Sequence, residues 1–129
     1  MSLTYNLKFT RKVEEKPELK KMIENHDNNL FLVSGLFSYD NGYIGGHFED
    51  NMLELELDEI SFISFDVIKK HAGSVLLRKS VLQMVHKITN EIYPKEDYYL
   101  IFNGDYIFEK RENGIVKRNS KSDFYDGLD

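Results

Sequence analysis

Hydrophobic and polar residues alternate strictly between residues 51 and 60, a stretch that reads NMLELELDEI. A β-strand points successive side chains to opposite faces, so this pattern predicts a strand with one apolar face and one acidic face. The apolar face holds Leu53, Leu55 and Leu57, and the acidic face holds Glu54, Glu56 and Asp58. The acidic run also includes Glu49, Asp50 and Glu59, and no Lys or Arg interrupts it.

The N-terminal part of the chain predicts a strand, a short helix and a second strand. Alternation over residues 3–13 is typical of a half-buried strand. Pro17 suits the first turn of a helix, and apolar residues at helical spacing predict a helix over 17–25. The run 30–39 (LFLVSGLFSY) begins with apolar residues at both odd and even positions. This indicates a strand covered on both faces, with Gly35 as a candidate bulge.

Turn-forming residues divide the middle of the chain. Residues 40–42 (Asp-Asn-Gly) predict a hairpin turn, since Asn and Gly adopt positive φ readily. A weaker strand is expected over 43–49, so that three consecutive strands would form a meander ending in the acidic strand. Residues 60–65 fit both periodicities and are interpreted as a further strand. Asp66 is a candidate N-cap for a helical turn through His71.

Helical periodicity is clearest from Ser74 to Tyr93. Pro94 ends this helix, because the residue before a proline is pushed out of α geometry. A second meander is expected over residues 98–118, where Asn-Gly pairs separate short apolar runs. The whole order predicts an α+β fold in which a mainly antiparallel sheet of about six to eight strands packs against one long helix (74–93) and one short helix (17–25).

Length and composition narrow the class of protein. A chain of 129 residues with 41% hydrophobic residues can bury a core of its own. We expect one globular domain over 1–118 and a polar, flexible tail over 119–129, with Phe124 and Tyr125 as candidate anchors. The absence of cysteine excludes disulfides, thiolate metal sites and a cysteine nucleophile. Without an apolar leader or a membrane-length apolar run, a cytoplasmic protein is expected.

The charge distribution favours a protein partner over a nucleic acid. The net charge is −5, whereas nucleic-acid binders usually carry a basic excess. Carboxylates on alternate residues of a strand lie about 6.6 Å apart, and such a row could pair with Lys and Arg of a basic partner and speed its approach. Two other interpretations stay open: the acids keep a wet strand face soluble, or Lys69, Lys70 or Arg78 neutralise them within the molecule.

Candidate chemistry is sparse. Residues 47–50 (HFED) could supply a histidine and a carboxylate to a metal if His26, His71 or His86 joined them. The spacing of a known metal motif is absent, so neither a metal nor a cofactor is predicted, and His86 is interpreted as a surface residue. Neither Gly-x-Ser-x-Gly nor a phosphate-binding glycine loop occurs, and no catalytic residue is predicted.

Most aromatic residues are expected in the core of the sheet, and the two tyrosines that bracket residues 40–42 are the candidate exceptions. In size, charge and lack of cysteine the whole chain resembles bacterial immunity proteins, which neutralise a cognate toxin that is often a basic nuclease. No motif carries this resemblance. It implies a non-enzymatic inhibitor whose partner-binding residues are Glu49, Glu54, Glu56, Asp58, Tyr39 and Tyr43.

Two further functions remain as alternatives. The first is a small enzyme or ligand-binding domain, with an apolar or sugar-like ligand held between the sheet and the long helix by groups such as His47, Glu49 or Tyr98. The second is a structural protein that dimerises through an exposed sheet, so the chain is expected as a monomer or a homodimer. Neither a nucleic acid nor a membrane is expected as a partner.

Overall fold

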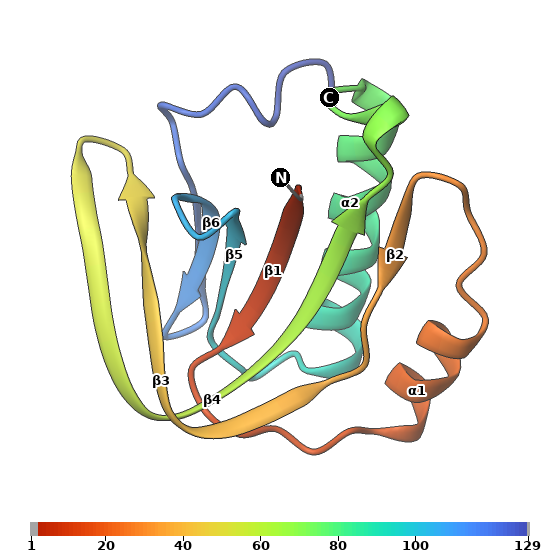
Figure 1. Cartoon of the computed structure of the whole chain (residues 1–129). Coiled ribbons are helices and arrows are strands. Elements are labelled where there is room, and N and C mark those ends of the chain that lie inside the picture. Colours follow the sequence, from red (N-terminus) through yellow and green to blue (C-terminus); the bar gives the residue numbers. More distant parts are fainter. Residues whose placement is uncertain (1–2, 129) are drawn as a thin grey trace.

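A computed structural model of the chain describes residues 3–128 and shows a mostly antiparallel sheet with one long and one short helix (Figure 1). The α+β fold class predicted from the sequence is confirmed. The elements are β1 (Thr4–Phe9), α1 (Pro17–Glu24), β2 (Phe31–Val33), β3 (Phe37–Phe48), β4 (Asn51–Val67), α2 (Val75–Lys87), β5 (Tyr98–Phe102), β6 (Tyr106–Glu112) and β7 (Ile115–Arg118).

The long helix begins and ends where local signals place it. The Ser74 side chain caps α2 by accepting a hydrogen bond from the Leu77 N–H at 3.0 Å. A π-helical turn, η2 (Ile88–Ile92), continues α2 up to the residues before Pro94. A short 3₁₀ turn, η1 (Lys69–His71), precedes α2 in place of the helical turn expected to begin at Asp66. Within residues 3–128, no helix is long and apolar enough to cross a membrane.

The hairpin turn predicted at residues 40–42 is wrong. β3 runs through these residues, and Asp40 and Gly42 pair with Glu59 and Leu57 of β4. The chain reverses instead at Glu49 and Asp50, and Glu49 takes the positive φ of 56° that a tight turn requires. The positive φ of Asn41 produces a bend within the strand, and the glycine after it leaves room for Ile60 to pack there.

Five strands close into a circuit. β1 pairs with the C-terminal half of β4 on one side and with β5 on the other, and β5 pairs with β6. A single parallel bridge between His47 and Tyr106 joins β3 to β6. Figure 1 shows how the long β3–β4 hairpin curls round to reach β6. β2 continues the line of β3 along the same edge of β4 after a break at Ser34–Leu36, where Gly35 was expected to mark a bulge.

Two hydrophobic clusters lie on opposite faces of the central strands. The main core is between the sheet and α2, and its largest fully buried side chains include Phe9, Phe65 and Leu100. The second core lies inside the curl of the β3–β4 hairpin, and it consists of Ile44, Phe48, Ile60, Tyr99, Ile101 and Ile107. Leu53, Leu55 and Leu57 pack against this second core, so the predicted leucine face points inward.

The C-terminal segment from 119 to 128 has defined contacts. Asn119 is buried and bonds through its side chain to the backbone of Glu49, His47 and Ile107. Phe124 lies in the main core, 2% exposed, and the Tyr125 hydroxyl donates to the Phe108 carbonyl at 3.0 Å. The flexibility expected for this segment stays a prediction. Its two aromatic residues do contact the core as the sequence suggested.

The bend of β3 at Gly42 generates a stability prediction. A Cβ at this position would overlap Cβ and Cγ2 of Ile60, which is itself buried. Gly42→Ala is therefore expected to lower the free energy of unfolding by about 1–3 kcal/mol, as overpacking does elsewhere. Urea denaturation measures this change.

Gly35→Ala is the matched control, because nothing lies within 4 Å of a Cβ built there. It is expected to leave stability unchanged or slightly higher, through the lower entropy of the unfolded chain. Equal effects of the two substitutions would contradict the packing of Ile60 on Gly42.

Candidate functional site

The outer face of the β3–β4 hairpin carries the hairpin acids, which are Glu54, Glu56 and Asp58. All three are exposed, because the leucines between them turn inward to the second core. The Tyr43 hydroxyl donates a weak hydrogen bond of 3.4 Å to Glu54 Oε1. Among residues 3–128, no Lys, Arg or His nitrogen forms a salt bridge with any hairpin acid.

The basic residues that could have neutralised the hairpin acids are engaged or placed elsewhere. Arg78 uses Nη1 to donate to the carbonyls of Asp123, Phe124 and Asp126 at 2.7–3.1 Å. Lys69 is exposed in η1, and neither it nor its neighbour Lys70 forms an ion pair with a described carboxylate. The hypothesis of an internal salt network on this face is therefore not supported, and the carboxylates face solvent.

Both tyrosines predicted outside the core are exposed. The exposed fractions of Tyr39 and Tyr43 are 52% and 49%. Phe62 lies 5.9 Å from Tyr39 and 5.7 Å from Phe37, measured between ring centroids, so three aromatic rings follow one another across β3 and β4. A hollow of about 330 Å³ is lined by both tyrosines together with Lys8. Tyrosines at the rim of such a hollow are typical of the cores of protein interfaces.

Glu49 differs from the other predicted contact residues. It occupies the hairpin turn, where its N–H donates to Asn119 Oδ1 at 3.1 Å and its carboxylate accepts from the Ser120 hydroxyl at 3.1 Å. The remaining five residues lie along the hairpin itself. The structure thus places Glu49 beside the C-terminal segment, where it also lines a separate cavity.

A buried carboxylate that the sequence reasoning missed lies on β6. The register of β5 and β6 shifts between Leu100 and Ile101, because β6 has one extra residue there. This bulge turns Glu109 to the helix side of the sheet while Ile107 stays in the second core. The local sequence gives no signal for this placement, because strict alternation puts Glu109 on the same face as Ile107.

Four side chains surround the Glu109 carboxylate, which is fully buried. Tyr98 and Tyr125 donate their hydroxyls at 2.6 and 2.9 Å, His86 Nε2 lies at 2.7 Å, and Arg118 Nε lies at 3.9 Å. Burial alone raises the pKa of Glu109, but the hydrogen bonds from His86 and the two tyrosines outweigh it and lower the pKa. Burial, strengthened by the neighbouring charge of Glu109, raises the pKa of both tyrosines.

The interpretation of His86 as a plain surface residue is wrong, because its imidazole binds this carboxylate. A second buried charge of β6, Arg111, donates to the carbonyls of Thr89, Tyr93 and Glu96 at the C-terminal end of the helix. A glutamate–histidine pair can orient an imidazole as a base. Neither Glu109 nor His86 lines any of the cavities described within residues 3–128, however, so the geometry favours a role in joining helix and sheet.

The four histidines do not form a metal site. No group of three or more His, Asp or Glu side chains that could hold a metal ion occurs within the described part of the chain. His26 instead stacks on Phe31 and places Nε2 3.0 Å from the Phe31 carbonyl oxygen. His47 is exposed beside Tyr106, with 5.7 Å between their ring centroids.

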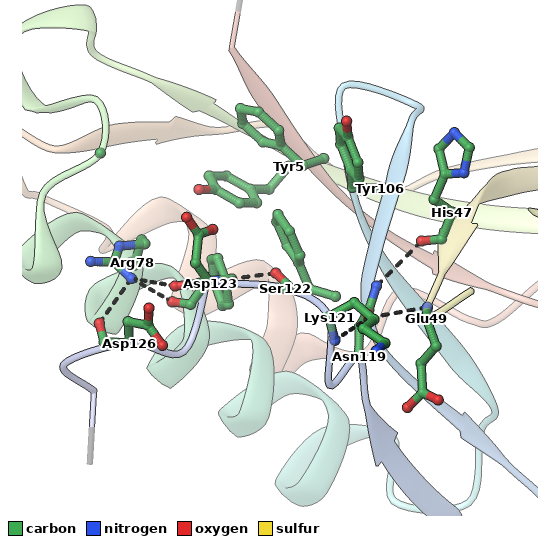
Figure 2. A pocket seen from close by; sticks show the side chains of 14 residues that line it. Tyr5, His47, Glu49, Arg78, Tyr106, Asn119, Lys121, Ser122, Asp123 and Asp126 are labelled. Atoms are coloured by element: carbon green, nitrogen blue, oxygen red, sulfur yellow. Dashed lines mark hydrogen bonds between the residues drawn. The ribbon is translucent and has the colours of Figure 1, made fainter. Parts of the chain in front are cut away.

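A cavity of about 740 Å³ lies between the sheet and the C-terminal segment (Figure 2). His47 and Glu49 line it, two of the three groups named for the ligand-binding alternative, which placed its pocket between the sheet and the long helix. Tyr98 does not, because its hydroxyl is held by Glu109 on the helix side of the sheet. The structure therefore brings together only two of the three groups predicted for a ligand pocket.

Comparison with protein-family models, with curated proteins and with solved structures finds no match to this chain. The function is therefore inferred from the residues and their geometry. Two features stand out, the solvent-facing hairpin acids with their tyrosines and the cavity beside the C-terminal segment.

The Glu109 site predicts a specific pH dependence of stability. Glu109→Gln puts an amide donor among groups that donate to a carboxylate, so at neutral pH it should lower the free energy of unfolding by about 2–4 kcal/mol. The pKa of Glu109 is lowered in the folded state, so its stabilisation is full above the ordinary value of 4.5 and is lost as pH falls through the lower folded value. The difference in free energy of unfolding between wild type and Glu109→Gln should therefore narrow as the pH falls below the folded-state pKa of Glu109.

Urea denaturation at a series of pH values measures this difference. Glu24→Gln, at an exposed glutamate of α1, is the control and is expected to follow the wild-type curve. A gap between wild type and Glu109→Gln that does not change with pH would contradict a charged Glu109 in the folded protein.

Proposed function

We propose that this protein is a small protein-binding module of the bacterial immunity type, which neutralises a basic toxin through the β3–β4 hairpin. It acts without catalysis, by covering the active site of the toxin or the path of its substrate. The hairpin acids bind Lys and Arg of the toxin, and Tyr39 and Tyr43 bind as aromatic anchors. Glu49, in the hairpin turn, is a further contact residue for the toxin.

One observation carries this proposal. The hairpin acids form a row of exposed carboxylates without a described salt-bridge partner, on a strand whose other face is packed in a core. Packing of Leu53, Leu55 and Leu57 holds the strand in place, so the carboxylates are arranged before a partner arrives. Preorganised charge of one sign increases the rate of association with a partner of opposite sign.

The neighbouring aromatic residues supply apolar contact area, which a row of charges lacks. Exposed ion pairs add little affinity each, whereas tyrosines at a hollow bury apolar area and dominate many interfaces. Tyr43 belongs to both parts, because it is one of the residues that line the hollow and its hydroxyl reaches Glu54. Met52, 53% exposed on the same strand, extends the apolar part of the surface.

A second candidate function rests on β7, the edge strand of the β5–β6–β7 meander. Within residues 3–128, β7 pairs only with β6, all four of its residues are exposed, and Ile115 and Val116 are 62% and 47% exposed. A free apolar edge can pair with the same strand of a second copy, which would make the protein a homodimer. Light scattering of the purified chain distinguishes this dimer from the monomer.

Neutralising the hairpin acids tests the proposed function. Glu54→Gln, Glu56→Gln and Asp58→Asn together should weaken the binding of a basic partner roughly 5- to 100-fold at low salt, because several charge pairs are lost at once. The partner is captured from cells of the source organism with the tagged protein at low salt and identified by mass spectrometry. Affinity for the purified partner is then measured against salt concentration.

The control combines Glu14→Gln, Glu15→Gln and Glu24→Gln, which changes the net charge equally but at exposed residues in and before α1. It should retain the partner. Failure to capture any basic partner, or equal affinity of the hairpin variant and the wild type, would rule out the acidic-face mechanism.

A further inference from the structure

The cavity of about 740 Å³ is bounded by segments from distant parts of the sequence. Tyr5 of β1 and Phe102 and Phe108 of β5 and β6 provide the aromatic floor, and the C-terminal segment from Asn119 to Asp126 forms one wall. Figure 2 shows His47 and Tyr106 at one side of this space and Arg78 with Asp123 at the other.

The Tyr5 side chain has a polar atom that the protein leaves unused. Tyr5 is 6% exposed and packs against the rings of Phe102, Phe108 and Phe124 at centroid distances of 4.7–5.9 Å. Its hydroxyl makes no hydrogen bond with any residue from 3 to 128, and it is accessible from the cavity, because Thr89 Oγ1 is the one side-chain polar atom of these residues that is both buried and unpaired. Figure 2 shows this hydroxyl pointing toward Asp123 and Arg78.

The surroundings keep Tyr5 in its protonated form. Burial raises the pKa of Tyr5 to about 12, and the charges of Arg78 and Asp123 act on it in opposite directions. The hydroxyl can therefore donate one hydrogen bond and accept another at neutral pH. A ligand in the cavity can satisfy both.

Arg78 builds the wall that faces this hydroxyl. Its Nη1 donates to three backbone carbonyls of the C-terminal segment, at residues 123, 124 and 126. These bonds hold the segment over the cavity and place the Asp123 carboxylate at its edge (Figure 2). Within the described residues, this carboxylate has neither a salt bridge nor a side-chain hydrogen bond, so its oxygens are available as acceptors.

The lining favours a ligand with one apolar face, several hydroxyls and no net charge. Its charged groups are of both signs, namely Arg78 and Lys121 against Glu49, Asp123 and Asp126. A ligand of either charge would meet repulsion from part of this wall, whereas hydroxyl groups can donate to the carboxylates and accept from the cations. The half-exposed ring of Tyr106 offers a flat apolar surface at the open side.

We propose that this cavity binds a neutral sugar ring of the pyranose type. One face of the ring lies on Tyr106 and Phe102, and its hydroxyls bond to the Tyr5 hydroxyl and the Asp123 carboxylate. The volume is within the range of small-ligand sites and accommodates one or two rings. The proposal can be tested apart from the hairpin acids, because it uses none of them and neither Tyr39 nor Tyr43; Glu49, which lines the cavity, also belongs to the proposed toxin surface.

A binding titration with neutral methyl pyranosides tests the proposal. Methyl glucoside, galactoside and mannoside are each added to the full-length ¹⁵N-labelled protein, and amide chemical shifts are followed by NMR. At least one glycoside should shift the amides of Tyr5, Phe102 and Asp123 at roughly 50 mM, a concentration that reveals millimolar dissociation constants. Tyr5→Phe keeps the ring and removes the hydroxyl, and it should weaken binding about tenfold.

Tyr43→Phe is the matched control, because it removes a hydroxyl of the hairpin that lies outside this cavity. It should bind the glycoside as the wild type does. Asp123→Asn is a second variant, expected to weaken binding without loss of the folded spectrum.

Three outcomes would overturn the proposal. The first is that no glycoside shifts these amides, and the second is that Tyr5→Phe and Asp123→Asn both bind as tightly as wild type. The third is that glucuronate or glucosamine binds more tightly than the neutral rings, which would show a charged ligand class. None of these outcomes affects the toxin-binding test, which depends on the hairpin acids.

Discussion

The buried carboxylate of Glu109 is the interaction on which the remaining architecture depends. Its hydrogen-bond donors come from α2, β5 and the C-terminal segment, and Arg118 of β7 approaches the same oxygens. Removing a carboxylate from water costs several kcal/mol unless all its acceptor positions are satisfied. α2, β5, β6 and the C-terminal segment must therefore pack together. This requirement couples elements that are far apart in the sequence.

This coupling explains why the two candidate surfaces coexist in a small chain. The C-terminal segment is held on one side by Tyr125 at Glu109 and on the other by Asn119 at the hairpin turn. It thus forms a wall of the cavity and contacts the end of the hairpin that carries the acids. Because the hairpin is packed on its leucine side, its outer face is free to bind a partner while the cavity stays open beside it.

Part of the candidate site could be predicted from residues alone and part could not. Alternation placed the leucines inward and the hairpin acids outward, and the two tyrosines flanking residues 40–42 were expected outside the core. Glu109 was missed because a β-bulge changes the face on which its side chain lies, and the bulge has no signature in the local sequence. Alternation placed Tyr5 in the core, but its second role as a lining residue of the cavity depends on where the C-terminal segment packs.

The sequence by itself determined the α+β class and both helices, because helical periodicity, the cap at Ser74 and the stop at Pro94 are local properties of the chain. Only the tertiary structure decided where the chain reverses, since Asn41-Gly42 and Glu49-Asp50 are both capable of turning. The reversal falls at Glu49 because the whole of β3 then pairs with the N-terminal part of β4 and Ile60 packs on Gly42. Such a choice depends on contacts between distant residues, which no local pattern contains.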